Sequence, residues 1–365
     1  MTQHPDHLRR LATEVEGAPQ AELVLAPEKD EDVAAILRYA SEQAMPVQVW
    51  GGGTRQGYGT PPPPGIVMST AKLNAVEAWE PDDLTLVVGP GAKVADVEEM
   101  LAQRSQTAVL PEVPAASTVG GTVAAGASAL RRGRLYSTRE RVLETRVVTG
   151  DGRTVRSGGR VVKNVSGYDL ARLSVGAFGS LGVVVSVCFK LFPNPPAGAT
   201  VRVENPGAAA VIARPLAVLE TREGTDVFIR GTEEDVAAKA LRLGGEARDG
   251  HHWPADPSGR FQWRLGVPPA MVSDALTRMP DGWPFVAVHG VGEIRAASET
   301  EDGALELRAW AEASDGYLVA ISRPREAVDF DAWGRPPPAL DLQRRLVGHF
   351  DPARIINPGR LPGGL

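Results

Sequence analysis

The chain has 365 residues, of which 43% are hydrophobic and 23% are charged, and its formal net charge is -6. Single hydrophobic cores stop growing at roughly 250–300 residues, so this length predicts two domains. The acidic balance argues against nucleic-acid and membrane-surface binding, because phosphate backbones and anionic lipids do not attract such a chain. The sequence contains no apolar run long enough for a transmembrane segment and no signal sequence. We therefore expect a cytoplasmic protein.

Residues 1–195 alternate strand and helix patterns, which predicts one α+β domain. Its expected strands lie at 23–25, 47–50, 84–88, 142–148 and 182–191, and its expected helices at 30–44 and 94–102. The residue pattern changes at the proline-rich stretch 193–196, which marks a domain boundary. Residues 196–335 are expected to form a smaller α+β cap domain with a strand at 227–230 and a helix at 233–243. Residues 336–365, with a helix at 339–350, are expected to form an arm that returns to the first domain.

A loop at 51–59 follows the second strand and contains five glycines in nine positions. Only glycine freely adopts the positive φ angles that aim consecutive backbone N–H groups at one point, and such a nest binds phosphate. Thr54 and Gln56 add side-chain donors and Arg55 adds a cation, which suits a pyrophosphate. The alternative is a mobile loop without a ligand. The G-x-G-x-x-G and Walker patterns do not occur, which disfavours NAD and ATP.

Two further segments are rich in small residues. The segment 117–128, S-T-V-G-G-T-V-A-A-G-A-S, would let a flat ligand lie against the backbone, or would form a tightly packed junction between a strand and a helix. In the segment 175–184, Gly176, Gly179 and Gly182 recur at every third position. This spacing fits close packing, and it also fits a turn that brings backbone onto a ligand. Both interpretations stay open for each segment.

The order of these motifs resembles the FAD-binding domain of the vanillyl-alcohol-oxidase, or PCMH-type, family. The set comprises the glycine loop, T-x-G-G at 118–121, K-N-V-S-G-Y-D-L at 163–170, G-x-x-G-S-L-G-V at 176–183 and N-P-G-R at 357–360. Residues 163–169 and 357–360 most resemble the FAD-binding subunits of bacterial glycolate oxidases. The resemblance implies a PCMH-type FAD-binding domain with two subdomains, followed by the cap domain and the C-terminal return arm.

By this resemblance, the glycine loop would hold the FAD pyrophosphate, and the segment 118–128 would line the flavin and the ribityl chain. Gly179, Gly182 and Val184 would offer backbone to the cofactor, and residues 357–360 would close the site. The implied cofactor-binding residues are Gly51, Gly52, Gly53, Thr54, Arg55, Gln56, Gly57, Thr118, Gly120, Gly121, Ala125, Ser128, Gly179, Gly182, Val184 and Asn357.

Histidine and cysteine usage limits the chemistry. No histidine occurs between residues 8 and 250, so the resemblance implies FAD bound without a covalent bond. Cys188 is the only cysteine, which excludes an internal iron–sulfur cluster. Hydroxy-acid-oxidising relatives resemble one another in a cluster of cap histidines, whereas His289 is isolated here and is a weak catalytic candidate. The neighbours His251 and His252 point apart, and no metal site is expected.

Five arginines could clamp a substrate carboxylate, and the sequence does not distinguish among Arg55, Arg139, Arg141, Arg172 and Arg323. The resemblance implies an FAD-dependent oxidoreductase, the FAD-binding subunit of a glycolate oxidase-like complex that takes or relays electrons from a 2-hydroxy acid such as glycolate or D-lactate. Its partners would be a larger flavin subunit and an iron–sulfur subunit. A self-sufficient 2-hydroxy-acid dehydrogenase and a cofactor-free structural subunit are the alternatives.

Overall fold

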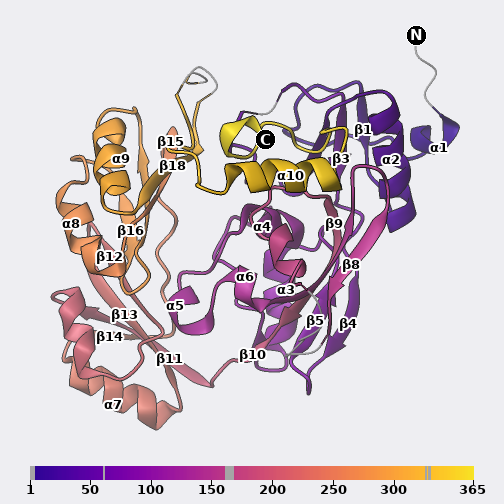
Figure 1. Ribbon diagram of the computed structural model, residues 1–365. Coiled ribbons are helices and arrows are strands. Elements are labelled where there is room, and N and C mark those ends of the chain that lie inside the picture. The colour runs from indigo at the N-terminus through magenta and orange to yellow at the C-terminus, as the bar shows by residue number, and fades with distance from the viewer. Residues whose placement is uncertain (1–4, 61, 161–167, 325–326, 328–329) are drawn as a thin grey trace. The chain divides into compact units, whose positions relative to one another are not determined.

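The computed structural model describes residues 5–60, 62–160, 168–324, 327 and 330–365 (Figure 1). Its chain divides into two compact units. The first unit comprises residues 1–128, 138–192 and 336–365, and the second comprises residues 129–137 and 193–335. Of the motif at 163–170, residues 163–167 lie outside the described residues. Among the described helices, none combines the length and the apolar character needed to cross a membrane.

The first unit begins with a parallel three-stranded sheet. Its strand order is β1 (Leu23–Leu25), β3 (Ile66–Ser69) and β2 (Val47–Trp50), and α2 (Asp30–Glu42) connects β1 to β2. The apolar residues of α2 recur at helical spacing and pack on this sheet. The C-terminal arm enters the same core after α10 (Leu340–Phe350), because Ile355 and Ile356 are buried there and Ile356 forms a parallel bridge to Val47.

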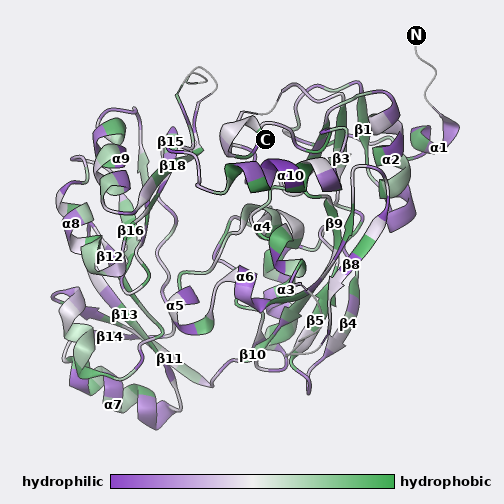
Figure 2. Ribbon diagram, in the orientation of Figure 1, coloured by the Kyte–Doolittle hydropathy of each residue, from purple (hydrophilic) through white to green (hydrophobic). Residues whose placement is uncertain are grey.

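A second sheet of the first unit is antiparallel and five-stranded. Its order is β4 (Val76–Glu80), β5 (Thr85–Val88), β9 (Val183–Lys190), β7 (Val142–Val148) and β8 (Thr154–Gly158). The central strand β9 is hydrophobic and buried along almost its whole length (Figure 2). It contains Cys188, whose thiol pKa is raised to about 11 by burial.

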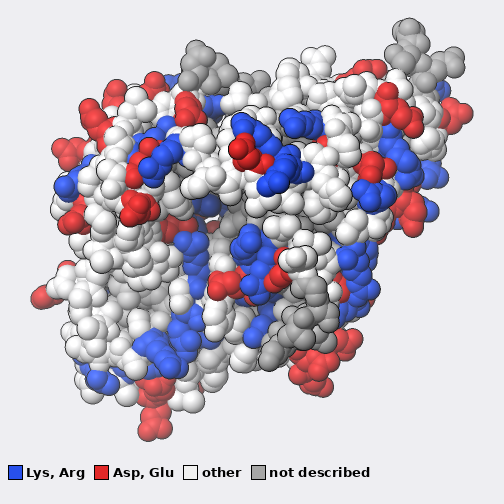
Figure 3. All heavy atoms as spheres, viewed as in Figure 1, with Lys and Arg blue, Asp and Glu red and all other residues white. Residues whose placement is uncertain are grey.

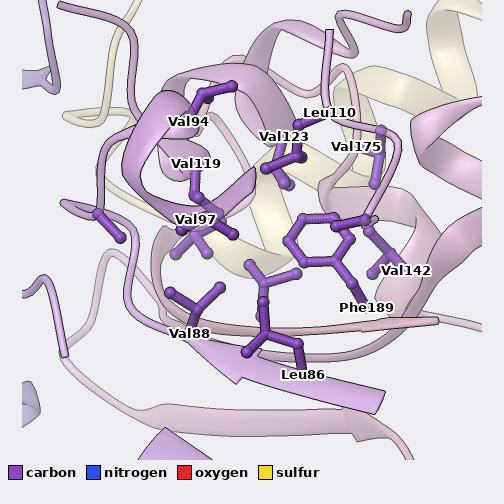
Figure 4. Packing of buried hydrophobic residues seen from close by; sticks show 14 of the residues in the cluster. Leu86, Val88, Val94, Val97, Leu110, Val119, Val123, Val142, Val175 and Phe189 are labelled. Atoms are coloured by element: carbon purple, nitrogen blue, oxygen red, sulfur yellow. The ribbon is translucent and has the colours of Figure 1, made fainter. Parts of the chain in front are cut away.

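Two helices cover this sheet. Val94 and Val97 of α3 (Val94–Ala102), together with side chains of α4 (Val119–Ala125), point toward Leu86 and Phe189 of the sheet (Figure 4). Shorter elements of this part of the chain are α1 (Asp6–Arg9), α6 (Thr138–Arg141), the 3-10 helix at Ala171–Ser174, and the paired strands β6 (Gln106–Thr107) and β10 (Phe192–Pro193).

The second unit is built on an antiparallel eight-stranded sheet of order β14-β11-β13-β12-β16-β17-β15-β18. Its strands are β11 (Ala197–Val203), β12 (Ala217–Thr221), β13 (Gly224–Gly231), β14 (Glu246–Asp249), β15 (Phe261–Gly266), β16 (Phe285–Val288), β17 (Glu293–Ser298) and β18 (Tyr317–Ser322). Its helices are α5 (Arg132–Leu135), α7 (Glu233–Leu243), α8 (Val272–Thr277) and α9 (Ala304–Ala313).

The helices α7, α8 and α9 cover one face of this sheet (Figure 1). Val227 packs with α7, Ile294 packs with α8 and α9, and the strand register places both on the same side. Side chains alternate between the two faces of a strand. Phe228 and Arg230 of β13 and Glu293 and Arg295 of β17 therefore lie on the other side, where Arg132 of α5 pairs with Glu293, and we call this side the α5 face.

The mixed helix-and-sheet class predicted from the sequence is confirmed. The predicted helices at 30–44, 94–102, 233–243 and 339–350 correspond to α2, α3, α7 and α10, and the predicted strands at 23–25, 47–50 and 142–148 correspond to β1, β2 and β7. Residues 129–137 group with the second unit although the sequence places them well inside the first expected domain.

Candidate functional site

A pocket in the first unit lies where β2 ends, beside α4 and the start of β9. It brings together segments that are more than 300 residues apart in the sequence, from Val49 to Arg360. Its lining residues are Val49, Gly51, Arg55, Gln56, Thr70, Pro90, Gly120, Gly121, Ala124, Ala125, Phe178, Gly179, Val183, Val184, Asn357 and Arg360.

The glycine loop forms one wall of this pocket. Gly53 has a positive φ of 73°, as does Gly59 with 65°, which agrees with the expected role of glycine there. Gly51 and Gly52 are needed for a different reason, because a Cβ atom on Gly52 would lie 1.6 Å from the Ala116 carbonyl oxygen. Within the described part of the chain, the N–H groups of Gly52 and Gly53 donate no hydrogen bond. These donors are available to a ligand.

Arg360, in the C-terminal arm, is a buried cation at the pocket. Its side chain is 3% exposed, and its guanidinium donates to the carbonyl oxygens of Gln56 and Tyr58, the latter at 2.8 Å, and to Gln56 Oε1. Burial lowers the Arg360 pKa to about 10, and among the described residues no carboxylate offsets this cost. A buried cation with neutral partners favours an anionic ligand.

Asn357 ties three segments together around the pocket. Its Oδ1 accepts a hydrogen bond of 2.9 Å from Val49 N–H at the end of β2, and its Nδ2 donates one of 2.6 Å to the Phe178 carbonyl oxygen. Its own backbone N–H donates to the Val47 carbonyl oxygen at 2.8 Å. Asn357 is buried and adopts a positive φ of 46°, which asparagine tolerates better than most residues. It therefore fixes the arm against both β2 and the turn before β9.

The small-residue segment at 117–128 packs tightly at Gly120 and leaves space beside Gly121. Thr118 is buried at the N-terminus of α4, where its Oγ1 accepts a hydrogen bond of 3.2 Å from Gly121 N–H. A Cβ atom on Gly120 would lie 2.5 Å from Pro90 Cβ, so Gly120 is required for packing. A Cβ atom on Gly121 would meet nothing nearer than 3.4 Å, so Gly121 presents bare backbone to the pocket.

Several residues expected at the site do not line the pocket: Gly52, Gly53, Thr54, Gly57, Thr118, Ser128 and Gly182. The Thr54 hydroxyl is instead hydrogen-bonded to Ser117 Oγ at 3.0 Å, which ties the glycine loop to the residue before Thr118. The Ser128 hydroxyl accepts a hydrogen bond of 3.1 Å from Thr138 N–H. These two residues flank the segment 129–137, which belongs to the second unit. Gly182 has a φ of 129° and packs against the Val148 carbonyl oxygen.

Seven lining residues were not among the candidates from the sequence: Val49, Thr70, Pro90, Ala124, Phe178, Val183 and Arg360. Arg360 is the last residue of the N-P-G-R motif, and Phe178 lies between two of the glycines that recur at every third position. Both were therefore within recognised motifs. Their burial depends on contacts with distant segments and gives no local signal.

The five candidate arginines lie in different places. Arg55 lines the pocket, whereas Arg139 is exposed. Arg141 is fully buried and donates to Thr138 Oγ1 at 3.0 Å and to the Ala108 carbonyl oxygen. Arg172 pairs with Asp169 at 2.9 Å, and Arg323, in the second unit, donates to the Phe330 carbonyl oxygen. Arg55 is thus the candidate that the structure places at the pocket.

The three cap histidines all lie in the second unit. His289 Nε2 is 2.7 Å from Glu220 Oε2, on the face of the sheet that the helices cover. His251 Nε2 contacts the Ile229 carbonyl oxygen at 2.9 Å, and His252 Nε2 contacts that of Asp249 at 2.8 Å. Among the described residues, no group of three or more histidine, cysteine, aspartate or glutamate side chains is placed to hold a metal ion.

The composition of the pocket defines the ligand that it suits. Arg55 and Arg360 are its charged lining residues, and no carboxylate lies among the residues that line it. Together with the N–H groups of the glycine loop, they suit a doubly charged phosphate group. The rest of the lining is mostly small or apolar and includes Ala125, Val184 and Phe178, which suits a flat aromatic ring system. A nucleotide with a pyrophosphate and a large flat ring fits both parts.

Comparison with known proteins agrees with this chemistry. Residues 21–158 match the family model for an FAD binding domain. Glycolate oxidase subunit GlcE of Escherichia coli is 31% identical over 314 residues, which cover 78% of this chain and 83% of that protein. D-lactate dehydrogenase of Archaeoglobus fulgidus is 35% identical over 175 residues, and glycolate oxidase subunit GlcD of Bacillus subtilis is 33% identical over 194 residues.

The last two matches cover 47% and 51% of this chain but only 39% and 41% of those relatives, so the chain spans less than half of their length. Among solved structures, alkyldihydroxyacetonephosphate synthase matches with a TM-score of 0.65 at 14% sequence identity, over 93% of this chain and 76% of that one. This likeness shows a shared fold.

Proposed function

Because the chain belongs to the family of PCMH-type FAD-binding proteins that includes the glycolate oxidase subunits GlcE and GlcD, we propose that FAD binds without a covalent bond in the pocket of its first unit. We also propose that the chain is the FAD-binding subunit of a 2-hydroxy-acid-oxidising complex. The chain is an FAD-binding oxidoreductase related to glycolate oxidase subunits and D-lactate dehydrogenases. The buried, charge-uncompensated Arg360 is the observation that supports this location for the cofactor.

Three groups of residues would hold the cofactor. Arg360 and Arg55, which line the pocket, would bind the pyrophosphate. The N–H groups of Gly52 and Gly53, which follow the lining residue Gly51 in the loop, would add donors. The bare backbone at Gly121 would allow close approach of the ribityl chain or the ring. Apolar residues such as Val184 would exclude water from the ring.

Bound FAD would supply the acceptor for the two electrons released when a 2-hydroxy acid becomes a 2-oxo acid. This oxidation also requires a base for the hydroxyl proton. No histidine, carboxylate, lysine, tyrosine or cysteine is found among the residues that line the pocket. With one cysteine, the chain also cannot carry an iron–sulfur cluster as an electron outlet. We therefore infer that a larger flavin subunit and an iron–sulfur subunit complete the complex, and that this chain takes or relays electrons.

We predict that Gly53→Val lowers the FAD content of the purified protein at least about tenfold. Valine at φ +73° is strained, and its Cβ would lie 2.9 Å from the Trp50 ring. Absorbance at 450 nm per mole of protein measures the loss, and circular dichroism checks the fold. Gly17→Val is the matched control, because Gly17 has a φ of +72° in the same unit but lies outside the glycine loop, with no other atom within 4 Å of an added Cβ. Normal FAD content in folded Gly53→Val would refute the assigned role of the loop.

Arg360→Gln is expected to weaken FAD binding by about 10–100-fold, because charge-assisted hydrogen bonds contribute roughly 1.5–3 kcal/mol. Titration of the apo-protein with FAD, followed by fluorescence, gives the dissociation constant. The control is Arg354→Gln, an exposed arginine of the same arm. An unchanged dissociation constant in Arg360→Gln would place the pyrophosphate elsewhere.

Acid or heat should release the flavin quantitatively. The pocket lining contains no histidine, cysteine or tyrosine to which the isoalloxazine could be bonded. After precipitation with trichloroacetic acid, we expect the yellow colour and the FAD in the supernatant. Flavin that stays with the precipitated polypeptide would contradict non-covalent binding.

The isolated chain, fully loaded with FAD, should show little or no flavin bleaching with glycolate or D-lactate under anaerobic conditions. Activity should appear when the partner subunits are added, since they would supply the base and the electron outlet. Rapid bleaching of the lone chain would instead establish a self-sufficient dehydrogenase. His289, paired with Glu220, would then be the first residue to replace.

A further inference from the structure

Three arginines of the second unit gather on the α5 face of its sheet. Arg131 directly precedes α5, and Arg134 lies within it. Arg230 lies on β13 two residues after Phe228, on the same side of the strand. Trp253 stacks on Phe228 with ring centroids 4.1 Å apart, and the Arg131 guanidinium lies 5.7 Å from the centre of the Trp253 ring. We call this set, Arg131, Arg134, Arg230 and Trp253, the basic surface. Figure 3 shows lysine and arginine side chains gathered in this region, near α5 and β11.

The basic surface includes two positive charges, those of Arg134 and Arg230, that no carboxylate among the described residues neutralises. The pKa of Arg230 is lowered by burial and further by the nearby charges of Arg134 and Arg131. A local excess of this kind is unexpected in a chain whose formal net charge is -6.

Neighbouring arginines show that the second unit does use carboxylates to neutralise cations. Arg132 pairs with the buried Glu293 at 3.2 Å, and Arg295 pairs with Asp256 at 2.7 Å. On the same segment of chain, Arg132 is therefore compensated within the unit while Arg134 is not. The uncompensated charges are best explained by an anionic group that comes from outside the chain.

The residue types favour a protein as the source of that anionic group. Arginine, tryptophan and tyrosine are the side chains most enriched where protein interfaces gain their binding energy. Tyr136 follows Arg134 by two residues, is 54% exposed, and has φ 67° and ψ 159°, a strained conformation for a residue with a side chain. Strained backbone is concentrated at functional sites. A small anion, in contrast, would be bound by the guanidinium groups alone, without the aromatic side chains.

We propose that the basic surface is the docking site for an acidic segment of a partner subunit. This inference rests on the proposed function of the chain as one subunit of a complex. Complementary charges at an interface raise the association rate and the specificity, and their effect decreases with ionic strength. Assembly through this surface should therefore weaken as salt is added.

The test uses the full-length, FAD-loaded chain co-expressed with the GlcD-type flavin subunit and the iron–sulfur subunit of the same genome. Arg134→Glu and Arg230→Glu should each weaken assembly at least about tenfold, measured by size-exclusion chromatography and by titration of purified subunits. The FAD content should be unchanged. The matched control is Arg242→Glu, an exposed arginine on α7, which covers the opposite face of the same sheet. Arg134 is exposed, so its variant tests the proposal even if the half-buried Arg230→Glu fails to fold.

Each outcome decides between the two proposals. If the wild type assembles and both reversed variants assemble equally well, the docking surface is wrong and the proposed function stands. If the wild type does not assemble, the proposed function is contradicted, and a labelled octaglutamate peptide then tests the surface alone. Binding of this peptide that is lost in Arg134→Glu supports the basic surface, and equal binding overturns it. Loss of inorganic phosphate binding without any loss of assembly would identify a small-anion site and would also overturn the proposal.

Discussion

The pocket of the first unit depends on the burial of one guanidinium group. Arg360 donates hydrogen bonds to two backbone carbonyl oxygens of the glycine loop and to the side chain of Gln56, about 300 positions away in the sequence. Burial makes its positive charge costly and lowers its pKa to about 10. The hydrogen bonds of Arg360 shape the glycine loop, and its buried charge is what favours an anionic ligand at the pocket.

The remaining geometry of the site follows from how the arm that carries Arg360 is fixed. Asn357 bonds to β2 and to the turn before β9, and Ile356 extends the small parallel sheet beside Val47. The arm thereby joins the glycine loop to the Gly179 turn, and this turn is also bonded directly to α4, because Phe178 N–H donates to the Ala124 carbonyl oxygen. Binding of a cofactor that contacts all of these segments would stabilise the whole unit, since a ligand that binds only the folded state stabilises it by mass action.

Local patterns predicted most of the elements of the fold but little of their assembly. The helices α2 and α7 are visible because apolar residues recur at helical spacing, and β9 is visible as a continuous buried run. The glycine loop was recognised, yet Gly51 and Gly52 are glycines because the segment at 116–118 passes within contact distance, which no local pattern reveals. Arg360 was expected only to close the site together with the rest of its motif, and no local pattern indicated its hydrogen bonds to the glycine loop. Similarly, residues 129–137 group with the second unit, where Arg132 pairs with Glu293 about 160 positions away in the sequence, and no local pattern indicates such a contact.

The central claim is that the pocket recognises a pyrophosphate. FMN has the same isoalloxazine ring and ribityl chain as FAD but lacks the pyrophosphate and the adenosine, so a comparison of the two ligands tests this claim most directly. The measurement is a titration of the wild-type apo-protein with each ligand under identical conditions. The account predicts that FAD binds at least about 100-fold more tightly than FMN, which corresponds to roughly 2.7 kcal/mol. Equal affinities for FAD and FMN would contradict it.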